Sequence, residues 1–157
     1  MTDATPAPKI VTIDEGEEVT PFGIRMRVIL SKEETGGTFS ALVCHHQPGE
    51  GPPPHYHTEQ DEYFYVLTGA YEMTLAGETQ ICGPGTMVYI PRGTVHSFRN
   101  NGDEAASHLD WTLPGGQETY FREITEATRD AGESGFGEEV MAKIGEINRR
   151  HDTHFPG

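Results

Sequence analysis

The sequence predicts one all-β domain, an antiparallel sandwich or barrel, followed by two helices. Its 157 residues match the length of a single ordinary domain. From about residue 22 to 113, short runs rich in β-branched and aromatic residues alternate with turns rich in Gly, Pro and Asn. Beyond Pro114 turn residues become sparse and apolar residues recur every three or four positions. We therefore expect an N-terminal arm (1–18), a barrel (19–114) and a helical extension (115–157).

The elements can be assigned in order along the chain. The polar arm ends in "KIVTI", which is either mobile or an edge strand. Eight strands follow, at 24–30, 38–46, 62–69, 71–77, 79–83, 86–91, 96–100 and 107–113. Two amphipathic helices are predicted at 116–131 and 137–151, lying against the outside of the barrel. We expect their apolar stripes to serve packing and not ligand binding.

Composition argues against several classes of partner. The 25 acidic and 11 basic residues give a net charge of −14, which repels nucleic acid and anionic lipid. The start "MTDATPAPKI" has neither a basic leader nor an apolar signal core, so we expect a cytoplasmic protein with no membrane or nucleic-acid partner. Cys44 and Cys82 are the only cysteines, and we expect reduced core thiols. A disulfide or a metal-bound thiolate is less favoured, because neither cysteine belongs to a CxxC pair.

The segment "GPPPHYHTEQDE" places two histidines one residue apart. Residues i and i+2 of an extended chain point to the same side, so His55 and His57 project two imidazoles into one space. A pair of this kind alone is weak evidence for a metal site, since exposed loop histidines have the same spacing.

Two longer patterns contain this pair and further polar residues. In the first, five residues separate Gly49 from His55, and Glu62 and Gly69 follow His57. In the second, "GTMVYIPRGTVHSFRN" runs from Gly85 through Pro91, Gly93 and His96 to Asn100. The chain is identified by these two motifs as a member of the cupin superfamily, and the resemblance implies a double-stranded β-helix (jelly-roll) barrel. From about residue 20 to 125 it resembles small single-domain cupins related to quercetin 2,3-dioxygenase and to cupin-type polyketide cyclases.

The predicted metal ligands are His55, His57, Glu62 and His96. A closed barrel can bring His96 opposite the hairpin that carries the other three, and imidazole with carboxylate suits one divalent transition metal (Fe, Mn, Ni, Co or Zn). Glu59 and Asp61 compete with Glu62, which has the family spacing. In the alternative without metal, His55 and His57 are loop histidines, His96 is a core residue, and Glu62 pairs with Arg25 or Arg99.

Other residues can be assigned only by strand alternation. Phe64 and Phe98 lie two residues beyond Glu62 and His96, so they share the ligand-bearing face and are predicted to contact a substrate. Met73 and Trp111 are predicted substrate contacts of the same type, although inward aromatics often only fill a barrel. Of His45 and His46 only one can face inward, and His108 is a candidate hydrogen-bond partner behind the metal. His151 and His154 are expected to be solvated.

The resemblance implies an enzyme acting on a small hydroxylated aromatic or enol, whose oxygen binds the metal while Glu62 accepts its proton. A redox-active metal would permit a dioxygenase with dioxygen as co-substrate, which is the function we expect. With zinc, only cyclisation or isomerisation is open, and a non-catalytic ligand-binding cupin is the third alternative. Cupins of this type commonly pair, so a homodimer aided by the N-terminal arm is expected.

Overall fold

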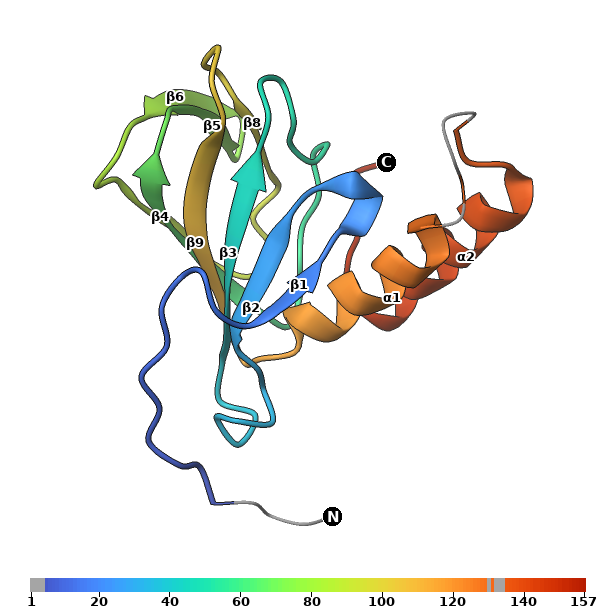
Figure 1. The fold of residues 1–157 in the computed structure, drawn as a ribbon. Coiled ribbons are helices and arrows are strands. Elements are labelled where there is room, and N and C mark those ends of the chain that lie inside the picture. The colour runs from blue at the N-terminus through green and yellow to red at the C-terminus, as the bar shows by residue number, and fades with distance from the viewer. Residues whose placement is uncertain (1–4, 130, 132–134) are drawn as a thin grey trace.

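Two antiparallel sheets make up most of the molecule in a computed structural model that describes residues 5–129, 131 and 135–157 (Figure 1). The larger sheet has six strands in the order β1-β2-β3-β9-β4-β7, and the smaller has three in the order β6-β5-β8. The strands are β1 (Glu17–Val19), β2 (Met26–Leu30), β3 (Ser40–His46), β4 (Asp61–Thr68), β5 (Tyr71–Leu75), β6 (Glu78–Cys82), β7 (Met87–Ile90), β8 (His96–Asn100) and β9 (Ala106–Leu113).

The chain passes repeatedly from one sheet to the other. It leaves the larger sheet after β4, forms β5 and β6, returns for β7, crosses again for β8 and ends the barrel with β9. This order is that of a double-stranded β-helix, and all eight strands expected between residues 24 and 113 are present as β2 to β9. The fold class predicted from the sequence is therefore confirmed.

Of the two alternatives for the N-terminal arm, the structure does not show the edge strand at "KIVTI". Residues 9–13 form no strand, and Ile10 is almost fully exposed. The edge strand is β1, in which Glu17 lies opposite Val28 and Val19 is buried. Val19 is buried in the core, whereas only Val11 of "KIVTI" packs on the protein, against the cluster of Ile29, Ala41 and Val43.

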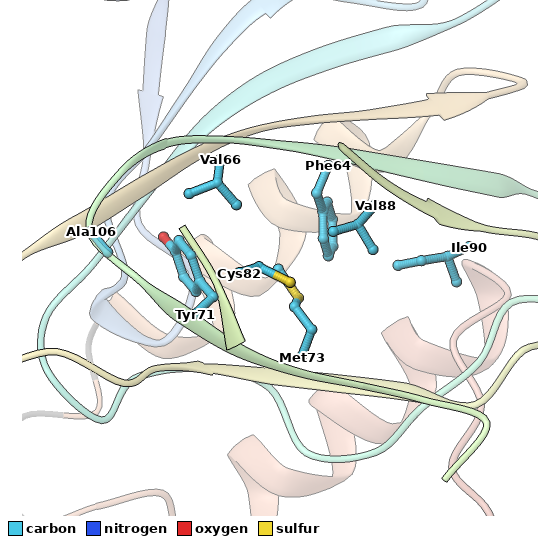
Figure 2. Packing of buried hydrophobic residues seen from close by; sticks show 8 residues of the cluster. All are labelled: Phe64, Val66, Tyr71, Met73, Cys82, Val88, Ile90 and Ala106. Atoms are coloured by element: carbon cyan, nitrogen blue, oxygen red, sulfur yellow. The ribbon is translucent and has the colours of Figure 1, made fainter. Parts of the chain in front are cut away.

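The core between the two sheets is shown in Figure 2. Inward side chains of both sheets pack there, following the period-2 alternation of each strand. Its buried members are Phe64, Val66, Tyr71, Met73, Cys82, Val88, Ile90 and Ala106. Gly69 makes the turn into β5 with a φ of 76°, and a Cβ there would lie 2.5 Å from the Cβ of Ala106, so only glycine fits.

Helices α1 (Gln117–Arg129) and α2 (Glu138–Arg150) lie side by side next to β1 and β2 (Figure 1). The two predicted helices are thus confirmed, and Ile124, Ile144 and Ile147 form a separate small core between them. A short 3-10 helix, η1 (Pro21–Gly23), connects β1 to β2 and packs on α1. No helix in the described part of the chain is long and apolar enough to cross a bilayer.

Candidate metal centre

The backbone itself brings the histidines of the two motifs together. His55 and His96 form an isolated antiparallel bridge, with N–H···O distances of 3.0 Å and 2.9 Å in the two directions. The segment before His55 passes so close to β8 that a Cβ on Gly51 would lie 1.8 Å from the carbonyl oxygen of Phe98. Glycine at this position therefore permits the bridge, and His57 follows on the same side as His55.

Glu62 reaches this cluster from the larger sheet. It is the second residue of β4, where alternation directs it inward, and only 3% of its surface is exposed. Its Oε1 lies 3.0 Å from Nε2 of His96 and 3.9 Å from Nε2 of His57. The four ligand atoms of His55, His57, Glu62 and His96 all lie within 4.8 Å of one another. The structure thus brings together the four residues predicted as metal ligands.

All three rings are held in the same way. Nδ1 of each histidine donates a hydrogen bond of 2.9 Å to a main-chain carbonyl. The accepting carbonyls are those of Pro53 for His55, Asp152 for His57 and Thr94 for His96. In a neutral ring this bond places the proton on Nδ1 and leaves the lone pair of Nε2 free to bind a metal.

The contact between His96 and Glu62 indicates that the cluster suits a cation. Nδ1 of His96 already carries a proton, so in a neutral ring Nε2 would point its lone pair at the carboxylate of Glu62. That contact is repulsive, and a proton on Nε2 makes it a hydrogen bond. Burial opposes a charged ring, but the hydrogen bond and charge of Glu62 outweigh it and raise the pKa of His96. Burial likewise opposes the carboxylate, yet the bond from His96 and the nearby histidines lower the pKa of Glu62. A divalent metal in place of that proton would satisfy all four ligands.

The competing carboxylates take other roles. Asp61 accepts hydrogen bonds from the main chain and side chain of Arg92, and Glu59 is exposed at the cavity wall. The arginines that could have paired with Glu62 are also occupied elsewhere. Arg25 lies 4.0 Å from Glu18, and Arg99 binds Glu72 on the barrel exterior.

A cavity of about 680 Å³ extends from the cluster into the barrel and out to the helices. Phe64 and Phe98 line it, with ring centroids 5.1 Å apart in an edge-to-face arrangement. The helices also contribute, through Tyr120 and Phe121 among others. From the sequence, the apolar stripe of these helices was expected to serve packing alone. In the structure it also lines the cavity.

Neither Met73 nor Trp111 lines this cavity, contrary to the predicted substrate contacts. Met73 is 3% exposed and belongs to the core of Figure 2. Trp111 lies on the outer face of β9, stacked on Tyr63 with ring centroids 5.4 Å apart. The reason is alternation: Asp110 lines the cavity, so its neighbour Trp111 must point away from it.

Three residues near the metal ligands were missed from the sequence. Nε2 of Gln117, the first residue of α1, donates to Oε2 of Glu62 at 2.7 Å and to Oδ2 of Asp110 at 3.1 Å. Burial, then the charge of Glu62, raises the pKa of Asp110 well above its usual range. The third is Asp152, whose carbonyl orients His57. A polar residue among strand-forming ones signalled Asp110, but no local pattern marks Gln117 or Asp152.

The remaining histidines lie outside the cluster of His55, His57, Glu62 and His96. His46 is buried and its Nδ1 lies 2.9 Å from the hydroxyl of Tyr71, while His45 is half-buried, so only one of the pair faces inward, as expected. His108 is fully buried in β9 but makes no contact with the four ligands through its ring nitrogens, so the predicted supporting hydrogen bond is absent. His151 contacts Glu123 and His154 contacts Asp152, so neither is simply solvated.

Comparison with known proteins defines the class. Residues 42–112 match the model of the cupin domain family. Protein SchB of Streptomyces halstedii is 32% identical over 99 residues, which cover 62% of this chain and 72% of SchB. The chain belongs to the cupin family.

Two further relatives are named for different activities. Polyketide synthase CurC of Streptomyces cyaneus is 36% identical over 101 residues, covering 63% of this chain and 65% of CurC. Quercetin 2,3-dioxygenase of Bacillus subtilis is 26% identical over 117 residues, 74% of this chain but only 34% of the relative. The solved polyketide cyclase RemF of Streptomyces resistomycificus has the same fold, with a TM-score of 0.59 at 24% identity over 68% of this chain and 80% of RemF.

Proposed function

We propose that this protein is a metal-dependent cupin enzyme, a dioxygenase acting on a small hydroxylated aromatic or enol. The observation that carries the proposal is the convergence of three imidazoles and one buried carboxylate at the wall of a cavity of about 680 Å³. A cluster of metal-binding side chains next to a largely apolar cavity is typical of a catalytic site. The likeness to quercetin 2,3-dioxygenase supports the same substrate class.

Each residue has a proposed role. Nε2 of His55, His57 and His96 and the carboxylate of Glu62 would hold one divalent transition metal, which supplies Lewis acidity and, if redox-active, reactivity with dioxygen. Glu62 is the proposed acceptor of the substrate's hydroxyl proton, with Oε2 held by Gln117 and Oε1 turned towards the imidazoles. Phe64 and Phe98 would orient a flat ring and exclude water.

A zinc-dependent cyclase or isomerase is the second candidate. The likeness to CurC, a polyketide synthase, and to RemF, a polyketide cyclase, favours it. The same residues would bind and orient a polyketide-like enol, with Glu62 moving the proton and no dioxygen consumed. The cavity is large enough for a substrate with fused rings.

Two measurements separate these candidates. Protein purified without chelator or added metal is analysed for its elements, and oxygen uptake is then followed with a flavonol as substrate. A dioxygenase consumes oxygen with wild-type protein and loses that activity in Glu62→Gln, while Glu78→Gln remains active because Glu78 is exposed on β6, away from the cavity. Zinc in the purified protein and turnover of an enolic polyketide analogue without oxygen would favour the cyclase. A ligand that binds but is not turned over, with or without oxygen, would favour the non-catalytic ligand-binding cupin.

We also propose a homodimer formed through the outer face of β4 and β7. Tyr65 and Met87 lie opposite each other there, and Tyr63 is stacked on Tyr89. Met87 and Tyr89 are 56% and 54% exposed, which is unusual for large apolar side chains side by side on a sheet edge. Light scattering on Met87→Lys/Tyr89→Lys should then report a monomer where wild type is a dimer, and a dimeric variant would contradict this interface. Removing residues 1–18 tests the contribution expected of the arm.

A further inference from the structure

A second group of metal-binding side chains lies inside the barrel, apart from the four ligands described above. It consists of Cys44 on β3 with His108 and Asp110 on β9. Cys44 is the register partner of His108, and Asp110 follows two residues later on the same face of the sheet. One ligand atom from each of the three lies within 4.8 Å of the other two. The geometry of two paired strands therefore places a sulfur, a nitrogen and an oxygen around one point.

Three polar atoms of this group have no hydrogen-bond partner among the described residues. Both ring nitrogens of His108 and Oδ1 of Asp110 are buried without a hydrogen bond, and the two residues are 0% and 4% exposed. The ring of His108 is surrounded by other rings, including Phe64 at a centroid distance of 4.5 Å and Phe98 at 5.2 Å. Buried polar groups are almost always satisfied in folded proteins. The two ring nitrogens of His108, which have no partner among the described residues, are therefore available to bind a ligand.

The donor set points to a particular ligand. Thiolate, imidazole and carboxylate together are typical of zinc and related first-row cations, whereas calcium and magnesium prefer oxygen alone. The charges of a Cys44 thiolate and an Asp110 carboxylate would cancel those of a divalent cation, so the loaded site would be neutral and suited to burial. The four-residue cluster of the first site has only one acidic side chain and would keep a positive charge.

The cavity offers a route to this position. Cys44 and Asp110 both line the cavity that also contains Glu62 and His57. Gln117 bonds to Asp110 through Oδ2, which leaves the unsatisfied Oδ1 available. We propose that Cys44, His108 and Asp110 form a second divalent-metal site of the zinc class at the inner end of this cavity, with its remaining coordination position turned towards the cavity.

Cobalt substitution of the full chain tests the proposal, because a thiolate bound to Co²⁺ gives an intense near-ultraviolet charge-transfer band that imidazole and carboxylate ligands do not give. Wild type should bind two equivalents of Co²⁺ and show this band. Cys44→Ser should lose the band and one equivalent, while Cys82→Ser, which changes the other buried cysteine, should keep both. His55→Ala/His57→Ala should remove the first site and leave one equivalent with the band, so this variant separates the second site from the proposed enzyme centre.

The wild-type spectrum decides the matter even if a variant fails to fold. A single equivalent of Co²⁺ without a thiolate band would overturn the proposal. So would a crystal structure of zinc-soaked protein with an ordered water, and no metal, between Cys44, His108 and Asp110. Zinc bound by these three residues in that crystal would support it.

Discussion

Nδ1 of His57 donates a hydrogen bond to the main-chain carbonyl of Asp152, 95 residues away in sequence, at 2.9 Å. The carboxylate of the same aspartate accepts hydrogen bonds from the main-chain N–H groups of Thr58, at 2.9 Å, and Glu59, at 2.6 Å. Next to it, Tyr56 and His154 form an antiparallel bridge. The segment after α2 therefore holds, through these hydrogen bonds, the loop that carries two of the four candidate metal ligands.

Replacement of Asp152 should weaken metal binding without abolishing it. Asp152→Ala removes the acceptors for Thr58 and Glu59 and places alanine at a φ of 54°, so the main-chain carbonyl that orients His57 is less firmly held. We expect a loss of roughly 10- to 100-fold in metal affinity, measured by competition with a fluorescent chelator. Asp152→Asn tolerates the backbone conformation better and should fall between wild type and alanine. Asp103→Ala, in the exposed loop before β9, is the control. Equal affinities in all four proteins would show that the hydrogen bonds of Asp152 have no part in metal binding.

Gln117 should support Glu62 in a similar manner. Gln117→Met keeps the size of the side chain but removes the donor to Oε2 of Glu62, which then lacks its 2.7 Å bond. We expect metal affinity to fall by roughly 10-fold, because a ligating carboxylate freed from its partner is less well oriented. Gln80→Met, on the exposed strand β6, should behave as wild type in the same titration. Unchanged affinity in Gln117→Met would mean that α1 has no part in holding the metal.

Two aromatic substitutions should separate substrate binding from stability. Phe98→Ala removes cavity wall and should raise KM for a flat substrate while metal content stays constant. Trp111→Ala removes the ring stacked on Tyr63 outside the barrel and should lower the free energy of unfolding by about 1–3 kcal/mol with KM unchanged. Steady-state kinetics and urea unfolding on both variants check this. A raised KM in Trp111→Ala with an unchanged KM in Phe98→Ala would instead mean that Trp111 contacts the substrate.

Stability of the metal-free protein should fall as pH decreases from neutrality. Burial, then the nearby His108, lowers the pKa of His46 to about 3, compared with 6.5 in the unfolded chain. Between these values the unfolded chain binds more protons than the folded one, so the free energy of unfolding rises with pH. The stability that neutral His46 contributes is therefore lost progressively as pH falls below about 6.5. His46→Asn keeps an acceptor for Tyr71 but cannot titrate. The slope of unfolding free energy against pH, from urea titrations between pH 4.5 and 6, should decrease by up to about 1.4 kcal/mol per unit. An identical slope in the variant would show that His46 is not kept neutral by burial.

Much of the fold and the main cluster could be predicted from local patterns. The eight strands from β2 to β9 follow short β-rich runs between turn residues, and alternation placed Phe64 beside Glu62 on the inner face. The spacing of His55, His57, Glu62 and His96 identified four side chains that do lie together. Such features depend on period-2 geometry and on turns, which are encoded within a few residues of each strand.

The partners that orient these ligands were decided only by the tertiary structure. Asp152 and Gln117 reach the cluster because the two helices pack beside the barrel, and nothing near them in sequence records that contact. Trp111 was assigned to the wrong face, because its inward or outward direction depends on the register of β9 against β3 and β4. The sequence by itself determined which residues form strands and which could bind a metal, since both depend on local spacing. The packing of distant segments determined which side chains hold those ligands in place, because burial and long-range hydrogen bonds arise only when the whole chain is folded.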